Sequence, residues 1–310
     1  MTAPVAKPAD GGRPVVFVHA GSDADAPARL TALAAALSAR GRSSRVLPES
    51  KLGGVRGAIV VLPGDSGSSL LWRSRLGGNW ALLDVSGTEA GPRFPGTARL
   101  VDGAIFRSHR QQKALDRPRW TSRVIYDEPE PGLSPHAVAK GEFRVACFGL
   151  GAAGEHFGKL RGVAFIDSHP LRHAGQFNCH LSLRRPGPAE LYRAGGEVAN
   201  AAASSAVLVT MRDAAATELL GDDYPFYCSG DAAAISAAIA RAREARGGPL
   251  WKAALARLRE AGAKTALEQA VDGHLEHCAA VERARQGGTI VASTHLELEE
   301  PSRDQGSARH

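Results

Sequence analysis

Short apolar runs that alternate with alanine- and leucine-rich segments constrain the fold of this 310-residue chain more than any other feature. The first run, residues 14–19, is typical of a buried parallel strand, and a polar turn then leads into helical apolar spacing over residues 26–40. Gly41 ends that segment, as a glycine after a helix does. Further strands are predicted at 44–47, 58–62, 80–85, 104–107 and 123–126. Strands interleaved with helices predict an α/β fold with a parallel sheet.

The second half of the chain repeats this pattern behind an acidic segment rich in Pro and Gly at 127–135. Predicted strands follow at 144–148, 163–166, 178–183, 206–210 and 225–227, and predicted helices at 190–203, 214–220 and 232–245. A long helix is expected over 253–285, with breaks near Gly262 and Gly273. We therefore predict two Rossmann-like domains that face each other across a cleft. The expected parts are a flexible leader (1–13), an N-terminal domain (14–138), a C-terminal domain with closing helices (139–285) and a disordered tail (286–310).

Composition and charge narrow the class of protein. No run of eighteen apolar residues occurs, and the first ten residues lack the apolar core of a secretory signal. The four cysteines form no Cys-x-x-Cys pair, so neither a disulfide framework nor a zinc ribbon is expected, and a reducing cytoplasm fits best. The net charge of +6 comes without a long basic block. It favours a small phosphorylated substrate over nucleic acid, and this mild basicity is the one hint of a peripheral membrane contact.

A glycine-rich turn follows the predicted strand at 144–148. Residues 149–154 match G-x-G-x-x-G, with Gly149, Gly151 and Gly154 at the glycine positions, a turn that lets backbone approach a pyrophosphate. The next acidic residue, Asp167, lies only thirteen positions beyond Gly154, against the roughly twenty expected of a dinucleotide site. Three interpretations stay open: a dinucleotide site, a phosphate-facing loop of another nucleotide site, and a tight turn that only joins two elements.

A more specific pattern runs over residues 193–226, where a helix of small residues at 201–205 leads into an apolar strand ending at Thr210, then a loop and a second helix carrying Glu218. This block resembles the nucleotide-sugar segment of family 1-like GT-B glycosyltransferases. The opening strand and turn, with the helix that spans 29–41, are also similar to that family. So are the closing helices from around 249–251 onward, which the resemblance implies cross back to the first domain, although only the block at 193–226 is distinctive.

The resemblance implies donor-binding residues in the second domain. The loop at 210–213 offers backbone N–H groups and the Arg212 guanidinium for phosphate, and Glu218 is placed to reach a ribose or sugar hydroxyl. Retaining family members usually carry two glutamates that would align with Tyr192 and Asn200, and neither residue is acidic. Asn200 is still able to bond a ribose hydroxyl, and Glu197 to contribute a carboxylate.

Two arginines are further candidates for the donor site. Arg184 and Arg185 follow the predicted strand at 178–183, at the sheet edge where ligands of open α/β folds bind. We predict that they contact phosphate. The full set of predicted donor-binding residues is Gly149, Gly151, Arg184, Arg185, Glu197, Asn200, Thr210, Arg212 and Glu218.

An inverting transferase needs a general base on the acceptor side of the cleft. His19 and Asp23 follow the first strand and are the predicted catalytic residues. Asp84 closes another first-domain strand and is expected to line the acceptor site, together with the residues at 107–109. The residues that come closest to a metal-binding pattern are His274, His277 and Cys278. They lie on one predicted helix without a carboxylate partner, which is more typical of a helix surface, so no metal is expected.

The sequence therefore predicts a metal-independent glycosyltransferase that uses no cofactor and takes a nucleoside-diphosphate sugar as donor substrate. The acceptor is a glycan, a lipid-linked sugar or a small molecule. An NAD(P)-dependent oxidoreductase using the glycine motif is one alternative. A non-catalytic binding protein on the same fold is another, and the missing glutamate pair favours it.

Overall fold

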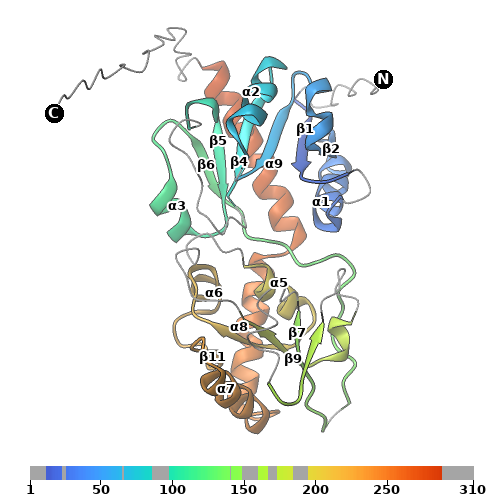
Figure 1. The fold of residues 1–310 in the computed structure, drawn as a ribbon, viewed down its shortest axis with the longest axis vertical. Helices are drawn as coiled ribbons and strands as arrows, with labels where there is room; N and C mark the ends of the chain where they lie inside the picture. The colour runs from blue at the N-terminus through green and yellow to red at the C-terminus, as the bar shows by residue number, and fades with distance from the viewer. Residues whose placement is uncertain are drawn as a thin grey trace, which may run out of the picture.

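A computed structural model of the chain shows two parallel β-sheets, each flanked by helices, with one sheet above the other along the long axis (Figure 1). The residues it describes are 12–22, 26–64, 66–85, 98–139, 141–148, 160–166, 173–183 and 195–287. The predicted fold class, α/β with two Rossmann-like domains and a C-terminal helix that crosses back, is confirmed. No helix in the described ranges has the length and apolar content needed to cross a membrane.

The first sheet has six strands in the order β2-β1-β3-β4-β5-β6, all parallel. Their bounds are β1 Val15–His19, β2 Ser44–Pro48, β3 Ile59–Pro63, β4 Trp80–Asp84, β5 Gly103–Phe106 and β6 Thr121–Val124. The central strands β1, β3 and β4 are almost wholly buried because both faces of the sheet are covered, which explains their continuous apolar runs. The strand β6 begins two residues before the predicted range.

Helices cover the first sheet on both faces. Helix α1 (Ala28–Ala39) lies on one face, and Gly41 after it has a positive φ of 87°, as the predicted helix end requires. On the opposite face lie α2 (Ser68–Leu76), α3 (His109–Leu115) and two 3₁₀ helices, Glu49–Gly54 and Ala98–Leu100. The sequence analysis did not predict α2 and α3, because both are short and polar enough to be taken for turns.

The second sheet has five parallel strands in the order β11-β10-β9-β7-β8. Its elements are β7 Val145–Phe148, β8 Val163–Ile166, β9 Cys179–Ser182, β10 Val207–Met211, β11 Tyr227–Cys228, α5 Gly196–Ala203, α6 Ala214–Leu220 and α7 Ala232–Glu244. Each of these strands and α-helices lies within or overlaps a predicted one, while a short 3₁₀ helix at Ala174–Gln176 was not predicted. The predicted helix at 190–203 is found from Gly196, and residues 190–194 lie outside the described ranges.

The C-terminal region forms two helices, α8 (Pro249–Lys264) in the second domain and α9 (Leu267–Gln286), which runs back along the first domain (Figure 1). The predicted break near Gly262 is found three residues later, at Thr265 and Ala266, whereas the predicted break near Gly273 is wrong, because α9 runs through it. Both glycines lie inside helices at close contacts. A Cβ on Gly262 would come within 3.1 Å of Ala202, and one on Gly273 within 3.2 Å of Ile125. The glycines therefore permit close packing of the helices. Sequence alone does not distinguish a glycine with this role from a glycine that ends a helix.

Each sheet has a topological switch point, where chain connections leave in opposite directions. In the first sheet it lies between β1 and β3, because β2 follows β1 on the outer side. In the second sheet it lies between β7 and β9. Open α/β folds bind ligands at such points, beyond the carboxyl ends of the strands. The fold thus provides two candidate ligand sites, one in each domain.

Candidate functional site

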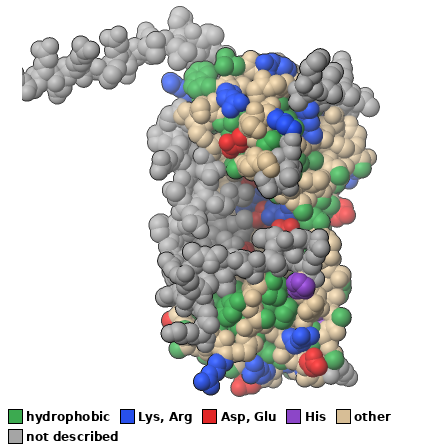
Figure 2. All heavy atoms as spheres, turned by 45° about the vertical axis from the view of Figure 1, so that its right-hand side comes forward, with side chains coloured by type: hydrophobic (Ala, Val, Ile, Leu, Met, Phe, Trp, Pro, Cys, Tyr) green, Lys and Arg blue, Asp and Glu red, His purple; other side chains and the backbone are tan. Residues whose placement is uncertain are grey.

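A cavity of about 890 Å³ opens at the switch point of the first sheet. Its described lining includes the end of β1 with Ala20, the end of β3, the first turn of α1, the linker residues Glu128 and Glu130, and His274 of α9. Apolar side chains such as Phe17, Leu33 and Val61 form one wall. Charged side chains form another, and Figure 2 shows acidic and basic groups together at mid-height, where the two domains face each other. A volume of this size is typical of a site for a small molecule.

His19, a predicted catalytic residue, lies in this cavity wall at the carboxyl end of β1. Its Nδ1 is 2.8 Å from the carbonyl oxygen of Ala20. A carbonyl only accepts hydrogen bonds, so Nδ1 carries the proton and Nε2 of the neutral ring holds the lone pair. The residue is 4% exposed, and its Nε2 has no hydrogen-bond partner within the described part of the chain. His19 therefore combines a place in the cavity wall with a buried ring nitrogen that has no hydrogen-bond partner among the described residues.

Arg107 lies deep in the same wall and is held by two carboxylates. Its guanidinium pairs with both oxygens of Asp84, lies 3.4 Å from Asp127 and donates to the carbonyl of Ile125 at 2.9 Å. Burial acts to lower the pKa of Arg107, but Asp84 and Asp127 outweigh it and the net shift is upward. The arginine therefore stays charged and fixes the ends of β4 and the linker relative to each other.

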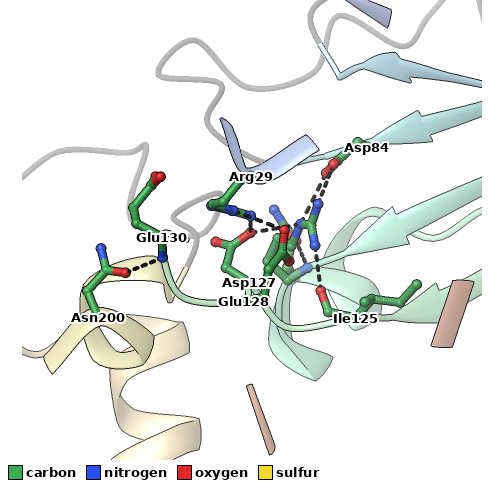
Figure 3. A network of polar contacts seen from close by, with 9 residues as sticks. Arg29, Asp84, Ile125, Asp127, Glu128, Glu130 and Asn200 are labelled. Carbon is green, nitrogen blue, oxygen red and sulfur yellow. Dashed lines mark hydrogen bonds and ion pairs between the residues drawn. The ribbon is translucent and has the colours of Figure 1, made fainter. Parts of the chain in front are cut away.

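Arg29, in the first turn of α1, is the second cation of the cavity. It donates to Asp127 at 2.6 Å and to Glu128 at 3.2 Å, as Figure 3 shows. Burial acts to lower the pKa of Arg29, but these two carboxylates outweigh it and raise that pKa above its ordinary value. The linker that leaves β6 is thus tied to α1 by ion pairs that are largely removed from water.

The second domain approaches this network through α5. A Cβ on Gly196, at the start of α5, would lie 3.7 Å from Arg29 and 3.8 Å from Asp127. One turn later, the side-chain oxygen of Asn200 accepts the backbone N–H of Glu130 at 2.8 Å (Figure 3). Asn200, which was predicted to bind a ribose, therefore lies beside the cavity. Its hydrogen bond holds the backbone of Glu130, a residue of the cavity lining.

Two other predicted donor-binding residues of the second domain, Thr210 and Arg212, are not part of the described cavity lining. The Thr210 hydroxyl is buried and donates to the carbonyl of Met211 at 3.3 Å. The Arg212 guanidinium lies 4.7 Å from the centre of the Tyr227 ring and donates to the backbone of Asp222 at 2.9 Å.

Glu218 and Glu197 complete the second-domain set. Glu218 accepts hydrogen bonds from Tyr126 and from the backbone of His109, and Glu197 is in the first turn of α5. The described cavity lining includes neither of these glutamates, nor Thr210 or Arg212. Their predicted role in donor binding stays a prediction.

Five predicted site residues lie outside the described ranges: Asp23, Gly149, Gly151, Arg184 and Arg185. Their places in the sequence are still informative. Gly149 directly follows β7, and Arg184 comes two residues after β9 ends. These are the two strands that flank the switch point of the second sheet. The positions at which the sequence analysis expected a phosphate site thus follow the two strands where open α/β folds bind ligands, and phosphate binding there stays a prediction.

The structure also shows where residues 107–109 and the two histidines of α9 lie. Arg107 and Asp84 line the cavity, and their role at an acceptor site stays a prediction, whereas Ser108 accepts the N–H of Gln111 and caps α3. The expectation that His274, His277 and Cys278 lie on a helix surface is wrong, because each is about 1% exposed where α9 packs on the first sheet. Within the described residues, no group of three His, Cys, Asp or Glu side chains is placed to hold a metal ion.

Sequence reasoning missed Arg29 and the linker carboxylates as site residues. The acidic run at 127–130 was noticed, but only as a mark of the domain boundary. The sequence clue to these site residues was the concentration of acidic side chains at 127–130 in a stretch rich in turn residues. Carboxylates in such a stretch are able to pair with an arginine that is distant in the sequence.

Comparison with known proteins identifies the fold of the chain but finds no close relative. No family profile and no curated protein sequence matches the chain. Among solved structures, Anabaena HepE in complex with UDP and glucose has a TM-score of 0.55 at 10% identity, over 86% of this chain and 100% of HepE. The chain has the GT-B fold. The kitacinnamycin glycotransferase matches with a TM-score of 0.48 at 11% identity, over 86% of this chain and 99% of that one. The trehalose 6-phosphate synthase of Burkholderia multivorans matches with a TM-score of 0.46 at 11% identity, over 88% and 100%.

Within this GT-B fold, the cavity belongs to the first of the two Rossmann-like domains. The glycine motif and the arginine pair follow strands of the second domain.

Proposed function

We propose that this protein is a glycosyltransferase that moves a sugar from a nucleoside diphosphate to an acceptor hydroxyl. The observation that carries the proposal is His19, a buried imidazole at the carboxyl end of β1 that lines a cavity of ligand size and whose Nε2 has no hydrogen-bond partner in the described part of the chain. The fold shared with HepE, which was solved with UDP and glucose, supports a nucleotide sugar as donor.

In the proposed reaction, the acceptor binds in the first-domain cavity and the donor at the edge of the second domain. His19 Nε2 takes the proton of the acceptor hydroxyl as that oxygen bonds to the anomeric carbon of the sugar. The bond between that carbon and the diphosphate oxygen breaks at the same time, and the nucleoside diphosphate leaves with the electron pair. Direct displacement of this kind inverts the anomeric configuration.

The leaving diphosphate needs positive charge or N–H donors as it departs. We assign this role to Arg184 and Arg185 and to the backbone of the glycine motif, since these follow the strands at the second switch point. No metal is part of the proposal. Arg107 and Arg29 are not assigned to the diphosphate, because carboxylates already bind both guanidiniums.

The first test is a thermal-shift panel with the common nucleoside diphosphates, nucleotide sugars and NAD(P). A ligand that binds only the folded state raises the melting temperature by mass action. We expect one nucleoside diphosphate and its sugars to stabilise the protein. Stabilisation by NAD(P) alone would establish the oxidoreductase alternative, and no stabilisation by any ligand would favour a non-catalytic protein.

The second test addresses His19 directly. With the donor identified, His19→Gln should lower kcat for sugar transfer by about 10²–10⁴-fold, the usual contribution of a general base, and leave donor affinity unchanged. His173→Gln is the matched control, because His173 is exposed and lies outside the described cavity lining. Equal kcat in the two variants would remove His19 from the mechanism.

A further inference from the structure

Helix α2 exposes two large apolar side chains on one face. Trp72 is 42% exposed and Leu76 is 82% exposed, and because they are four residues apart they are neighbours on the helix surface. The opposite face of α2 is buried through Leu70, Leu71 and Ser74. Four large hydrophobic side chains are exposed in the described part of the chain, and α2 carries two of them. Its outer face is therefore a place where exposed apolar surface is concentrated.

Two arginines lie beside this apolar face, next to the 3₁₀ helix at 49–54. Arg73 follows Trp72 in α2, and its guanidinium would be 3.6 Å from a Cβ on Gly53. Arg56 donates to the carbonyl of Gly53 at 2.7 Å. Both arginines are exposed, and neither forms an ion pair with a carboxylate of the described residues.

A third arginine lies where α2 meets the 3₁₀ helix at Ala98–Leu100. Arg75 of α2 donates to the carbonyl of Leu100 at 3.0 Å and so ties the two helices together. Arg99, directly before Leu100, is exposed. In α2 and the two 3₁₀ helices that pack on it, Glu49 is the one acidic residue. The apolar face thus has basic surroundings, and Figure 2 shows Lys and Arg side chains spread over the upper part of this domain.

We propose that this face of the first domain docks on a membrane that contains anionic phospholipids. Trp72 and Leu76 enter the headgroup region, and Arg56, Arg73 and Arg99 bind lipid phosphates. Helices that lie on membranes combine Trp or Leu with Lys and Arg in this way, and Trp is favoured at the depth of the headgroups. Figure 1 places α2 in the part of the first domain that lies away from the second domain, so the second domain does not obstruct the contact.

The size and charge of the face favour a membrane over another protein. A stable protein interface buries about 800 Å² on each partner, far more than two side chains supply. A peripheral membrane contact needs only a few inserted side chains together with attraction to anionic lipids. In a symmetric contact with a second copy, α2 would face α2 and the arginines of the two copies would repel each other. The proposal does not depend on the proposed reaction.

The test measures binding of the full chain to vesicles by co-sedimentation. One set of vesicles is phosphatidylcholine alone, and the other contains about one third phosphatidylglycerol, both at about 0.15 M salt. We expect the anionic vesicles to bind the protein at least about tenfold more tightly, since each arginine at a negatively charged surface contributes about fivefold. Raising the salt to about 0.5 M should weaken this binding several-fold.

A double variant tests the apolar part of the contact. Trp72→Ser together with Leu76→Ser should weaken binding to the anionic vesicles at least about tenfold, because moving one such side chain out of water is worth about that much. Both side chains are exposed, so the fold should be kept. The matched control is Leu250→Ser, since Leu250 on α8 is also 42% exposed but lies in the second domain. It should bind like the wild type.

A single variant tests the basic part. Arg73→Gln should weaken binding to the anionic vesicles about fivefold and leave binding to phosphatidylcholine unchanged. Arg259→Gln is the control, because it removes an exposed arginine from α8 in the second domain and lowers the net charge by the same amount. An equal loss in the two variants would mean that the vesicles respond to net charge alone, which would overturn the assignment to α2.

Tryptophan fluorescence distinguishes a membrane from another occupant of this face. Of the four tryptophans Trp72 is the exposed one, so brominated lipids in the anionic vesicles should quench a part of the wild-type emission that Trp72→Phe lacks. Binding that is equally tight in the double variant would overturn the proposal, and so would no binding to anionic vesicles. In the latter case, a dimer seen by sedimentation velocity and abolished by the double variant would assign the face to a second copy.

Discussion

The hydroxyl of Tyr126, on the linker between the domains, donates a hydrogen bond to the carboxylate of Glu218 on α6. The backbone N–H of His109, at the start of α3, donates to both oxygens of the same carboxylate, at 2.9 and 3.1 Å. Burial and the neighbouring Glu218 carboxylate raise the pKa of Tyr126, so its hydroxyl keeps the proton that it donates. The residue that the sequence analysis assigned to the donor is therefore engaged in a contact between the two domains.

Two variants distinguish the two roles of Glu218. Tyr126→Phe removes only the hydroxyl and should destabilise the protein by about 1 kcal/mol, the net worth of one hydrogen bond. If Glu218 binds the donor, this variant should also strengthen nucleoside-diphosphate binding a few-fold, because the carboxylate is released, whereas Glu218→Ala should weaken it. Calorimetric titration measures both. Unchanged affinity in both variants would mean that Glu218 only holds the domains together.

The buried ion pair of Arg107 should matter far more for stability than an exposed one. Arg107→Met removes the buried guanidinium that pairs with both oxygens of Asp84 and lies 3.4 Å from Asp127, and breaking a buried ion pair from one side costs about 3–5 kcal/mol. The control is Arg40→Met, whose partner Asp272 and own side chain are both about half exposed, so its loss should cost less than about 1 kcal/mol. Urea unfolding of the two variants measures the difference. Similar costs would show that the network at Arg107 is not desolvated.

The sequence predicts those features of this protein that depend on patterns within a short stretch of residues. Apolar runs and helical spacing are local, and they placed the described strands and the α/β class correctly. His19, Asp84 and Arg107 were also within reach, because each stands at the carboxyl end of a strand or directly after one. The pairing of Arg29 with Asp127 joins residues 98 positions apart, and no local pattern reports it.

The errors have the same origin. A break was predicted near Gly273 because glycine is a poor helix former, but its close approach to Ile125 inside α9 explains this glycine instead. His274 and His277 were expected at a surface because the sequence predicts that the C-terminal helix crosses back but does not show which face of α9 packs on the first sheet. Both errors concern which partner a helix packs on, and that is settled by the tertiary structure.

Asn200 tests how the second domain influences the acceptor cavity. Its side-chain oxygen accepts the N–H of Glu130, so Asn200→Ala should release that part of the linker and raise KM for the acceptor several-fold with little change in kcat. Asn200→Asp keeps an acceptor oxygen and should retain most of the affinity. Steady-state kinetics with both substrates provide the measurement. A change in donor affinity alone would instead support the ribose contact expected from the sequence.

Three buried histidines should make the protein sensitive to mild acid. Burial lowers the pKa of His180 and His277 to about 4 and holds that of His274 well below its ordinary value, although the carbonyl of Thr121 accepts a hydrogen bond from His277 Nε2 at 2.7 Å. In the unfolded chain these groups titrate near pH 6.5. The unfolded state therefore binds more protons than the folded state below that pH, so stability is complete above about pH 6.5 and is lost as the pH falls towards 4.

The expected slope is about 1.4 kcal/mol per pH unit for each histidine once its unfolded form is protonated. Urea unfolding at a series of pH values between about 7 and 5 measures it. His277→Gln keeps a donor for the Thr121 carbonyl and should reduce the slope by one proton. The exposed His173 provides the control, since His173→Gln should leave the slope unchanged. A slope that is the same in wild type and His277→Gln would mean that this histidine takes up its proton without unfolding, through an opening of α9 from the first sheet.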